Sequence, residues 1–211
     1  MIEMQPVLET PGRDGFDLWP VGPYEPYGFL PLGAAMSPAD VGTAVMQIAD
    51  HNEAEPGPGE EPAGSGDPAG RFLHGLLTSE YPVAPGGLRV FAPATGTVLR
   101  PGCCNGLEEW RDWYEVLDGD GFALFGHDPT PQARREGTLV RLTPDGAVRD
   151  GPVIELPLDG LRRLVTGAAD ELAAFLRLAD AWAAEHHPDR RAPLAAALAR
   201  AVGLGADTEE A

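Results

Sequence analysis

The chain has 211 residues, of which 43% are hydrophobic, which is enough to form the core of one moderately sized domain. Its formal net charge of -18 disfavours nucleic acid as a partner, because phosphates would be repelled, and favours a basic partner. All fifteen basic residues are arginine, so Schiff-base chemistry and a P-loop, which need a lysine amine, are excluded.

Other classes are disfavoured by what the sequence lacks. No run approaches eighteen apolar residues, so no membrane span is predicted. The first residues include Glu3 and form no apolar segment, so we expect no signal peptide and a cytoplasmic protein. None of the three serines lies in a Gly-x-Ser-x-Gly motif, which argues against a serine hydrolase.

The N-terminal quarter, residues 1–52, is predicted to be an arm rich in proline and aromatic residues, followed by one helix. Three arrangements are open for this arm: it covers the core of its own domain, it forms an edge strand, or it presents a binding surface. Ser37 and Pro38 are typical of a helix start, with serine as the cap and proline in the first turn. This helix is expected to end near His51.

Residues 53–70 are acidic and rich in proline and glycine, which predicts a disordered linker or a surface loop. Residues 71–204 are expected to form the α+β core domain, and residues 205–211 an acidic tail. The pattern leaves open whether the linker tethers an arm or interrupts one domain.

The core domain is predicted to contain one mainly antiparallel sheet of about five strands with covering helices. Its C-terminal third is expected to be helical, with a short helix after Asp159, a long helix from Asp170 to His186 and a last helix from Pro193. Pro144, Asp145 and Gly146 predict a turn between the last two strands. The strands are expected at residues 88–91, 97–100, 122–125, 138–142 and 153–156.

Between the second and third of these strands lies a short predicted helix. Asn105 is expected to cap it, because Glu108 follows at the capping-box spacing. The helix is expected to bury one face, made of Leu107, Trp110, Tyr114 and Leu117.

The residues around this helix also suggest chemistry. Cys103, Cys104 and His127 are the residue types of a zinc site, but adjacent cysteines are not expected to ligate one tetrahedral ion, so no metal and no cofactor is the main prediction. An enzyme using Cys104 with His127 and Asp128 is the alternative, since a helix start lowers a thiol pKa. The other interpretation of His127 and Asp128 is a capped turn.

The leading functional hypothesis is a non-catalytic module that binds a basic protein. Carboxylates such as Glu109 and Asp112 would steer the partner, and Trp113, next to Trp110, would anchor it. The alternative for these residues is an ordinary solvated helix face with one core tryptophan.

The sequence resembles the SUKH superfamily of bacterial immunity proteins over about residues 86–185. The resemblance is carried by Asn105 and Gly106 beside a tryptophan-bearing helix, and by the strand at 153–156 before helices that hold Leu161 and Phe175. It implies a single α+β domain that neutralises a toxin by binding it. The sequence departs from the family because its Asn-Gly pair starts a helix.

Overall fold

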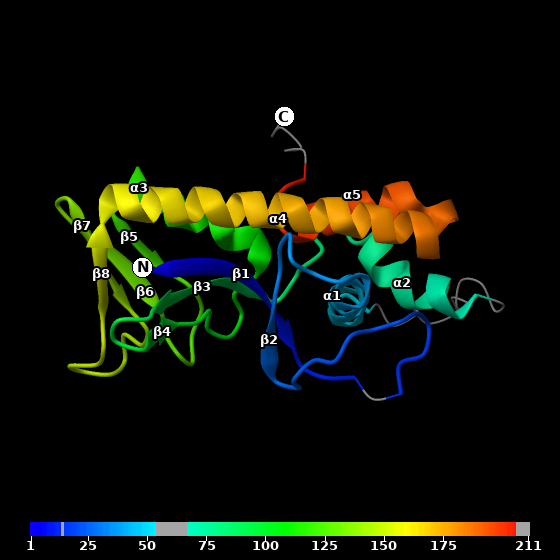
Figure 1. Ribbon diagram of the computed structural model, residues 1–211, viewed down its shortest axis with the longest axis horizontal. Helices are drawn as coiled ribbons and strands as arrows, with labels where there is room; N and C mark the ends of the chain where they lie inside the picture. Colours follow the sequence, from blue (N-terminus) through cyan, green and yellow to red (C-terminus); the bar gives the residue numbers. More distant parts are fainter. Residues whose placement is uncertain (14, 54–66, 206–211) are drawn as a thin grey trace.

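The computed structural model describes residues 1–13, 15–53 and 67–205. Within them the chain forms two four-stranded antiparallel sheets with helices packed against them, which confirms an α+β fold but replaces the predicted single sheet. The two sheets occupy one end of the molecule (Figure 1). Three helices gather at the other end, namely α1 (Pro38–His51), α2 (Pro68–Thr78) and α5 (Arg191–Ala201).

The first sheet has the strand order β2-β1-β3-β4. Its centre is supplied by the N-terminal segment, since β1 pairs with β2 on one side and with β3 on the other. Residues 1–10 are therefore an integral part of the sheet. The strands are β1 (Glu3–Thr10), β2 (Gly28–Pro31), β3 (Gly86–Ala92) and β4 (Thr97–Leu99).

The second sheet is a meander in sequence order, β5-β6-β7-β8. Three of its strands were predicted from their sequence. The fourth, β6, was missed because its sequence QARRE carries four polar side chains and only Ala133 is buried. The strands are β5 (Phe122–Leu124), β6 (Gln132–Glu136), β7 (Leu139–Thr143) and β8 (Ile154–Pro157).

The helices pack on these sheets and on one another. Ser37 caps α1 as predicted, because its hydroxyl accepts from the amide of Asp40. The predicted disorder of residues 53–70 lies mostly outside the described residues, but the last residues of that range are helical, because Asp67 caps α2 and the helix begins at Pro68. The helical elements are α1 (Pro38–His51), α2 (Pro68–Thr78), η1 (Leu107–Asp112), α3 (Trp113–Leu117), α4 (Leu158–His186), η2 (Pro188–Arg190) and α5 (Arg191–Ala201).

One continuous helix, α4, replaces the two helices predicted between Asp159 and His186. It runs along the molecule and passes over both sheets (Figure 1). All but one of its buried residues belong to a single core cluster that also contains Leu8 of β1, Trp113 of α3 and Val140 of β7. The C-terminal third is helical, as predicted.

The segment after β4 differs in detail from its prediction. The 3₁₀ helix η1 begins one residue later than expected, with Gly106 as the cap residue, and Glu109 accepts a hydrogen bond from the Gly106 amide at 3.3 Å. The side chain of Asn105 instead donates to the carbonyl of Gly86 at 2.7 Å, which ties this segment to β3. The buried face follows a shorter turn than 3.6 residues, so Trp113 is buried and Tyr114 is partly exposed.

Candidate functional site

Cys103 and His127 are brought together by a short antiparallel backbone bridge. Cys103 follows β4 of the first sheet, and His127 follows β5 of the second. The Cys103 amide donates to the His127 carbonyl at 2.6 Å, and the His127 amide donates to the Cys103 carbonyl at 3.1 Å. The bridge therefore connects the two sheets at the point where the thiols and the imidazole emerge.

Two glycines allow the chains to approach this closely. A Cβ on Gly102 would lie 2.3 Å from the carbonyl oxygen of Pro129. Gly126 has a φ of +98°, and a Cβ there would lie 2.7 Å from the carbonyl oxygen of Cys103. Any side chain at either position would push the two segments apart.

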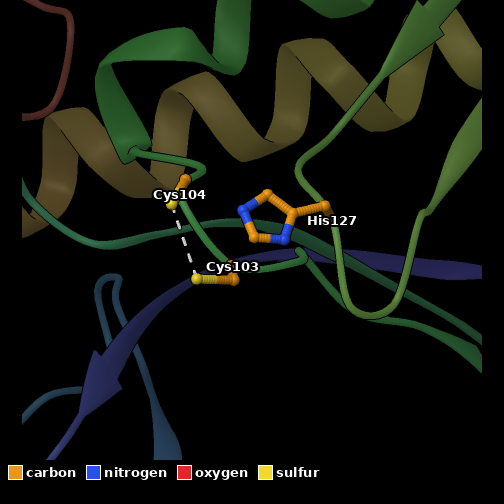
Figure 2. Close-up of side chains that lie close together, drawn as sticks. All are labelled: Cys103, Cys104 and His127. Atoms are coloured by element: carbon orange, nitrogen blue, oxygen red, sulfur yellow. Dashed lines mark hydrogen bonds between the residues drawn. The ribbon is translucent and has the colours of Figure 1, made fainter.

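Cys104 has a left-handed backbone conformation, with φ of 62°. Adjacent cysteines were not expected to bind one ion, and in a regular strand their side chains would point to opposite faces. The turn at Cys104 removes this alternation, and the Sγ atoms of Cys103 and Cys104 lie 3.5 Å apart (Figure 2). The pair is thus a vicinal dithiol with both sulfurs available on one side.

His127 completes the cluster. Its imidazole lies beside the two thiols (Figure 2), and one donor atom from each of the three residues falls within 4.8 Å of the others. The Nδ1 atom of His127 lies 3.4 Å from a carboxylate oxygen of Asp128. The opposite nitrogen, Nε2, points toward Cys104 (Figure 2).

The cluster shifts the pKa values of the two thiols in opposite directions. The pKa of the Cys104 thiol is lowered by its hydrogen bond with Cys103 and by the neighbouring imidazole of His127. The pKa of the Cys103 thiol is raised, because it hydrogen-bonds to Cys104 and lies beside that residue's charge. The pKa of His127 is raised mainly by Cys104 and then by Asp128. Of the two thiols, Cys104 is therefore the one that loses its proton more readily.

The cluster is open to solvent, with all three residues exposed. Glu9, on the neighbouring strand β1, adds negative charge close to both thiols and disfavours their ionisation. Glu9 is half-buried, and burial raises the pKa of its carboxyl. Nothing in the sequence pointed to Glu9, since it lies 94 residues before Cys103 and within the predicted arm.

The residues predicted to bind a partner divide into two groups. Trp110 and Trp113 are 5% and 1% exposed, and Trp113 stacks on Phe125 with ring centroids 4.1 Å apart. These indoles belong to the core and are not available at the surface. Glu109 and Asp112 are exposed, and the pKa of Asp112 is raised by partial burial and by the charge of Glu109.

Comparisons with known proteins found no similar protein. No family model, no curated protein and no solved structure matches it. No helix among the described residues has the length and apolar character needed to cross a bilayer.

Proposed function

We propose that this protein binds a thiophilic metal ion at Cys103, Cys104 and His127. The observation that carries the proposal is the 3.5 Å separation of the two Sγ atoms, with an imidazole nitrogen in the same cluster. Two sulfurs bound to one tetrahedral zinc ion at about 2.3 Å each are about 3.8 Å apart. The thiols therefore need only a small adjustment to share one ion.

The donor set selects for soft or borderline ions. Two thiolates and one imidazole suit zinc and copper(I), whereas magnesium and calcium prefer oxygen ligands. The lowered pKa of the Cys104 thiol favours binding near neutral pH, because a thiol ligand must lose its proton. Three protein donors leave a fourth position for water or another ligand, and all three donor residues are exposed to solvent.

The groups around the donors fit the same proposal. Asp128 can accept a hydrogen bond from Nδ1–H of His127, which leaves Nε2 free to bind a metal. Glu9 and Asp128 carry negative charge that a cation would offset. The carboxylate of Glu9, which disfavours thiolates when no metal is bound, would thus favour binding of a cation.

The direct test is a zinc and cobalt titration of the reduced, metal-stripped protein, with competition against a chromophoric chelator. We expect one equivalent to bind, with a thiolate-to-cobalt charge-transfer band in the near ultraviolet. Cys104→Ser and His127→Gln each remove a proposed ligand, so each should weaken binding by more than the about tenfold to hundredfold that is typical of losing a group that only supports a ligand. His74→Gln is the matched control, because His74 is an exposed histidine on α2 outside the cluster.

Two results would contradict the proposal. One is binding of well under one equivalent to the reduced wild-type protein. The other is a double variant, Cys103→Ser with Cys104→Ser, that binds zinc with the same affinity as the wild type.

Binding of a basic protein is the second candidate function. Glu109 and Asp112 lie exposed on consecutive turns. The pKa values of Asp112 and Glu108 are raised mainly by partial burial and further by the charge of Glu109. This like-charge repulsion would be relieved by a cationic partner. The proposed surface therefore consists of the carboxylates alone, without Trp110 and Trp113. If the basic partner is a toxin, this second candidate function is the immunity-type role that the SUKH resemblance implies.

Affinity capture with the double variant Glu109→Gln, Asp112→Asn tests this second function. A basic partner retained by the wild type and lost by the variant, with faster association at low salt, would support it. Equal capture by the two proteins would count against this surface.

A further inference from the structure

The outward face of the first sheet carries a hollow that the metal site does not use. It has a volume of about 260 Å³ and is lined by Glu3, Gln5, Arg89, Phe91, Val98 and Arg100. All six come from β1, β3 and the end of β4. Their inward neighbours Leu88, Val90 and Leu99 are buried, so these six side chains share the face turned away from the core.

The strand register arranges them in two rows across the sheet. In the first row, Phe91 lies between Glu3 of β1 and Val98 of β4. In the second row, Arg89 lies opposite Gln5 of β1, and Arg100 follows β4 on the other side of Arg89, one residue beyond the Val90–Leu99 pair. An apolar row and a cationic row therefore lie next to each other.

The cationic row places two arginines side by side without a carboxylate partner. No ion pair within 4.0 Å joins either guanidinium to an acidic residue in the described part of the chain, whereas six other arginines there have such partners. Like charges on neighbouring strands repel each other. Retaining two unpaired cations together in a chain of net charge -18 leaves a local site for an anion.

Arg89 is also held in place. Its Nη2 atom donates to Oε1 of Gln5 at 3.1 Å, and Arg89 is only partly exposed. A guanidinium fixed in this way loses less side-chain entropy when it binds a carboxylate than a free one does. Beside it, partly exposed Phe91 and Val98 offer apolar contact area.

We propose that this hollow binds a small organic carboxylate that carries an apolar group. The carboxylate would contact Arg89 and Arg100, and the apolar group would lie on Phe91 and Val98. Glu3, at the far end of the apolar row, limits the ligand to one negative charge, since a second anionic group there would meet its carboxylate. This proposal does not depend on the metal site.

The test is a titration of isotopically labelled protein with 3-phenylpropionate at low salt, followed through the backbone and arginine Nε–Hε signals. We expect saturable shifts at Arg89, Arg100 and Phe91, with a Kd on the order of 1 mM for a ligand of this size. Arg89→Gln and Arg100→Gln should each weaken binding by about tenfold. Glu3→Gln should strengthen it by about twofold, because it removes a repelling charge.

Two controls make the result specific. Arg134→Gln should leave the affinity unchanged, because Arg134 is an exposed arginine over a phenylalanine ring in the other sheet. The neutral analogue 3-phenylpropanol and inorganic phosphate should each bind at least about tenfold more weakly than 3-phenylpropionate, since each offers half of the required contacts. Shifts that do not saturate, equal affinity for phosphate, or unchanged affinity in folded Arg100→Gln would each overturn the proposal.

Discussion

The rings of Trp113 and Phe125 stack nearly parallel, with centroids 4.1 Å apart and planes inclined by 13°. Phe125 follows β5 directly and accepts, through its carbonyl, the amide hydrogen bond of Gly102 at 2.8 Å. The stack therefore fixes the segment of the second sheet against which the cysteine-bearing segment is aligned.

Trp113→Ala is expected to destabilise the protein by about 3–5 kcal/mol, because it removes the largest side chain in the fully buried part of the core. Urea unfolding followed by circular dichroism measures this loss. Tyr114→Ala, at a neighbouring position that is 36% exposed, is the matched control and should cost about 1 kcal/mol or less. Similar losses in both variants would contradict the burial of Trp113.

Gly102→Ala is expected to separate the two segments that form the candidate metal site. The new Cβ would meet the Pro129 carbonyl and the His127 amide, so we expect a loss of about 1–3 kcal/mol in stability and weaker zinc binding. Gly167→Ala is the control, since a Cβ there meets nothing within 4 Å and lies in α4. That variant should be slightly more stable than the wild type. Normal zinc affinity in Gly102→Ala would argue that the bridge does not position the ligands.

His127→Gln is expected to slow alkylation of Cys104 near neutral pH. The imidazole contributes to lowering the pKa of the Cys104 thiol, so its removal raises that pKa and shifts the rate profile to higher pH. Iodoacetamide rates at Cys104, measured by peptide mass spectrometry in the presence of a chelator, should fall by about threefold or more. His74→Gln should react like the wild type, and an unshifted profile in His127→Gln would remove His127 from any thiol chemistry.

Glu108→Gln is expected to stabilise the protein at neutral pH by about 1 kcal/mol. Glu108 is half-buried, its Oε2 atom has no hydrogen-bond partner among the described residues, and burial raises the pKa of its carboxyl. The folded state therefore binds this proton more tightly than the unfolded state. Stability is highest below the unfolded pKa and falls as pH rises through the folded pKa.

Urea unfolding at several pH values from about 4 to 8 measures this dependence, which should flatten in Glu108→Gln. Glu136→Gln serves as the control, because Glu136 is an exposed glutamate at the end of β6. A wild-type slope retained in Glu108→Gln would assign the pH dependence to another group.

Local sequence patterns predicted the elements that obey them. Ser37 and Pro38 predicted the start of α1. The apolar residues Leu88 and Val90, which are both buried, belong to the segment that was predicted as a strand and forms β3. The same rules failed at β1, where Pro6 lies opposite Leu88 in a central strand although proline cannot donate a ladder hydrogen bond. They also failed where two helices were predicted, one after Asp159 and one from Asp170. The single helix α4 continues through Gly167, because packing along the helix outweighs the low helix propensity of glycine.

The candidate site shows the same limit. Cys103, Cys104 and His127 were recognised as residue types that suit a metal, but their geometry depended on the φ of 62° at Cys104 and on a bridge between residues 24 positions apart. Neither leaves a periodic signal in the sequence. The burial of Trp113 was also hidden, because η1 is a 3₁₀ helix and its turn displaces the buried face from the predicted one.

The length of α4 has a consequence for how the molecule opens. Its 29 residues extend about 44 Å, and the helix contacts β1 of the first sheet as well as β7 and β8 of the second. Neither sheet can expose its inner face to water while this helix stays in place. The slowest-exchanging amides of both sheets should therefore belong to one cooperative unit, and they should exchange together through global unfolding.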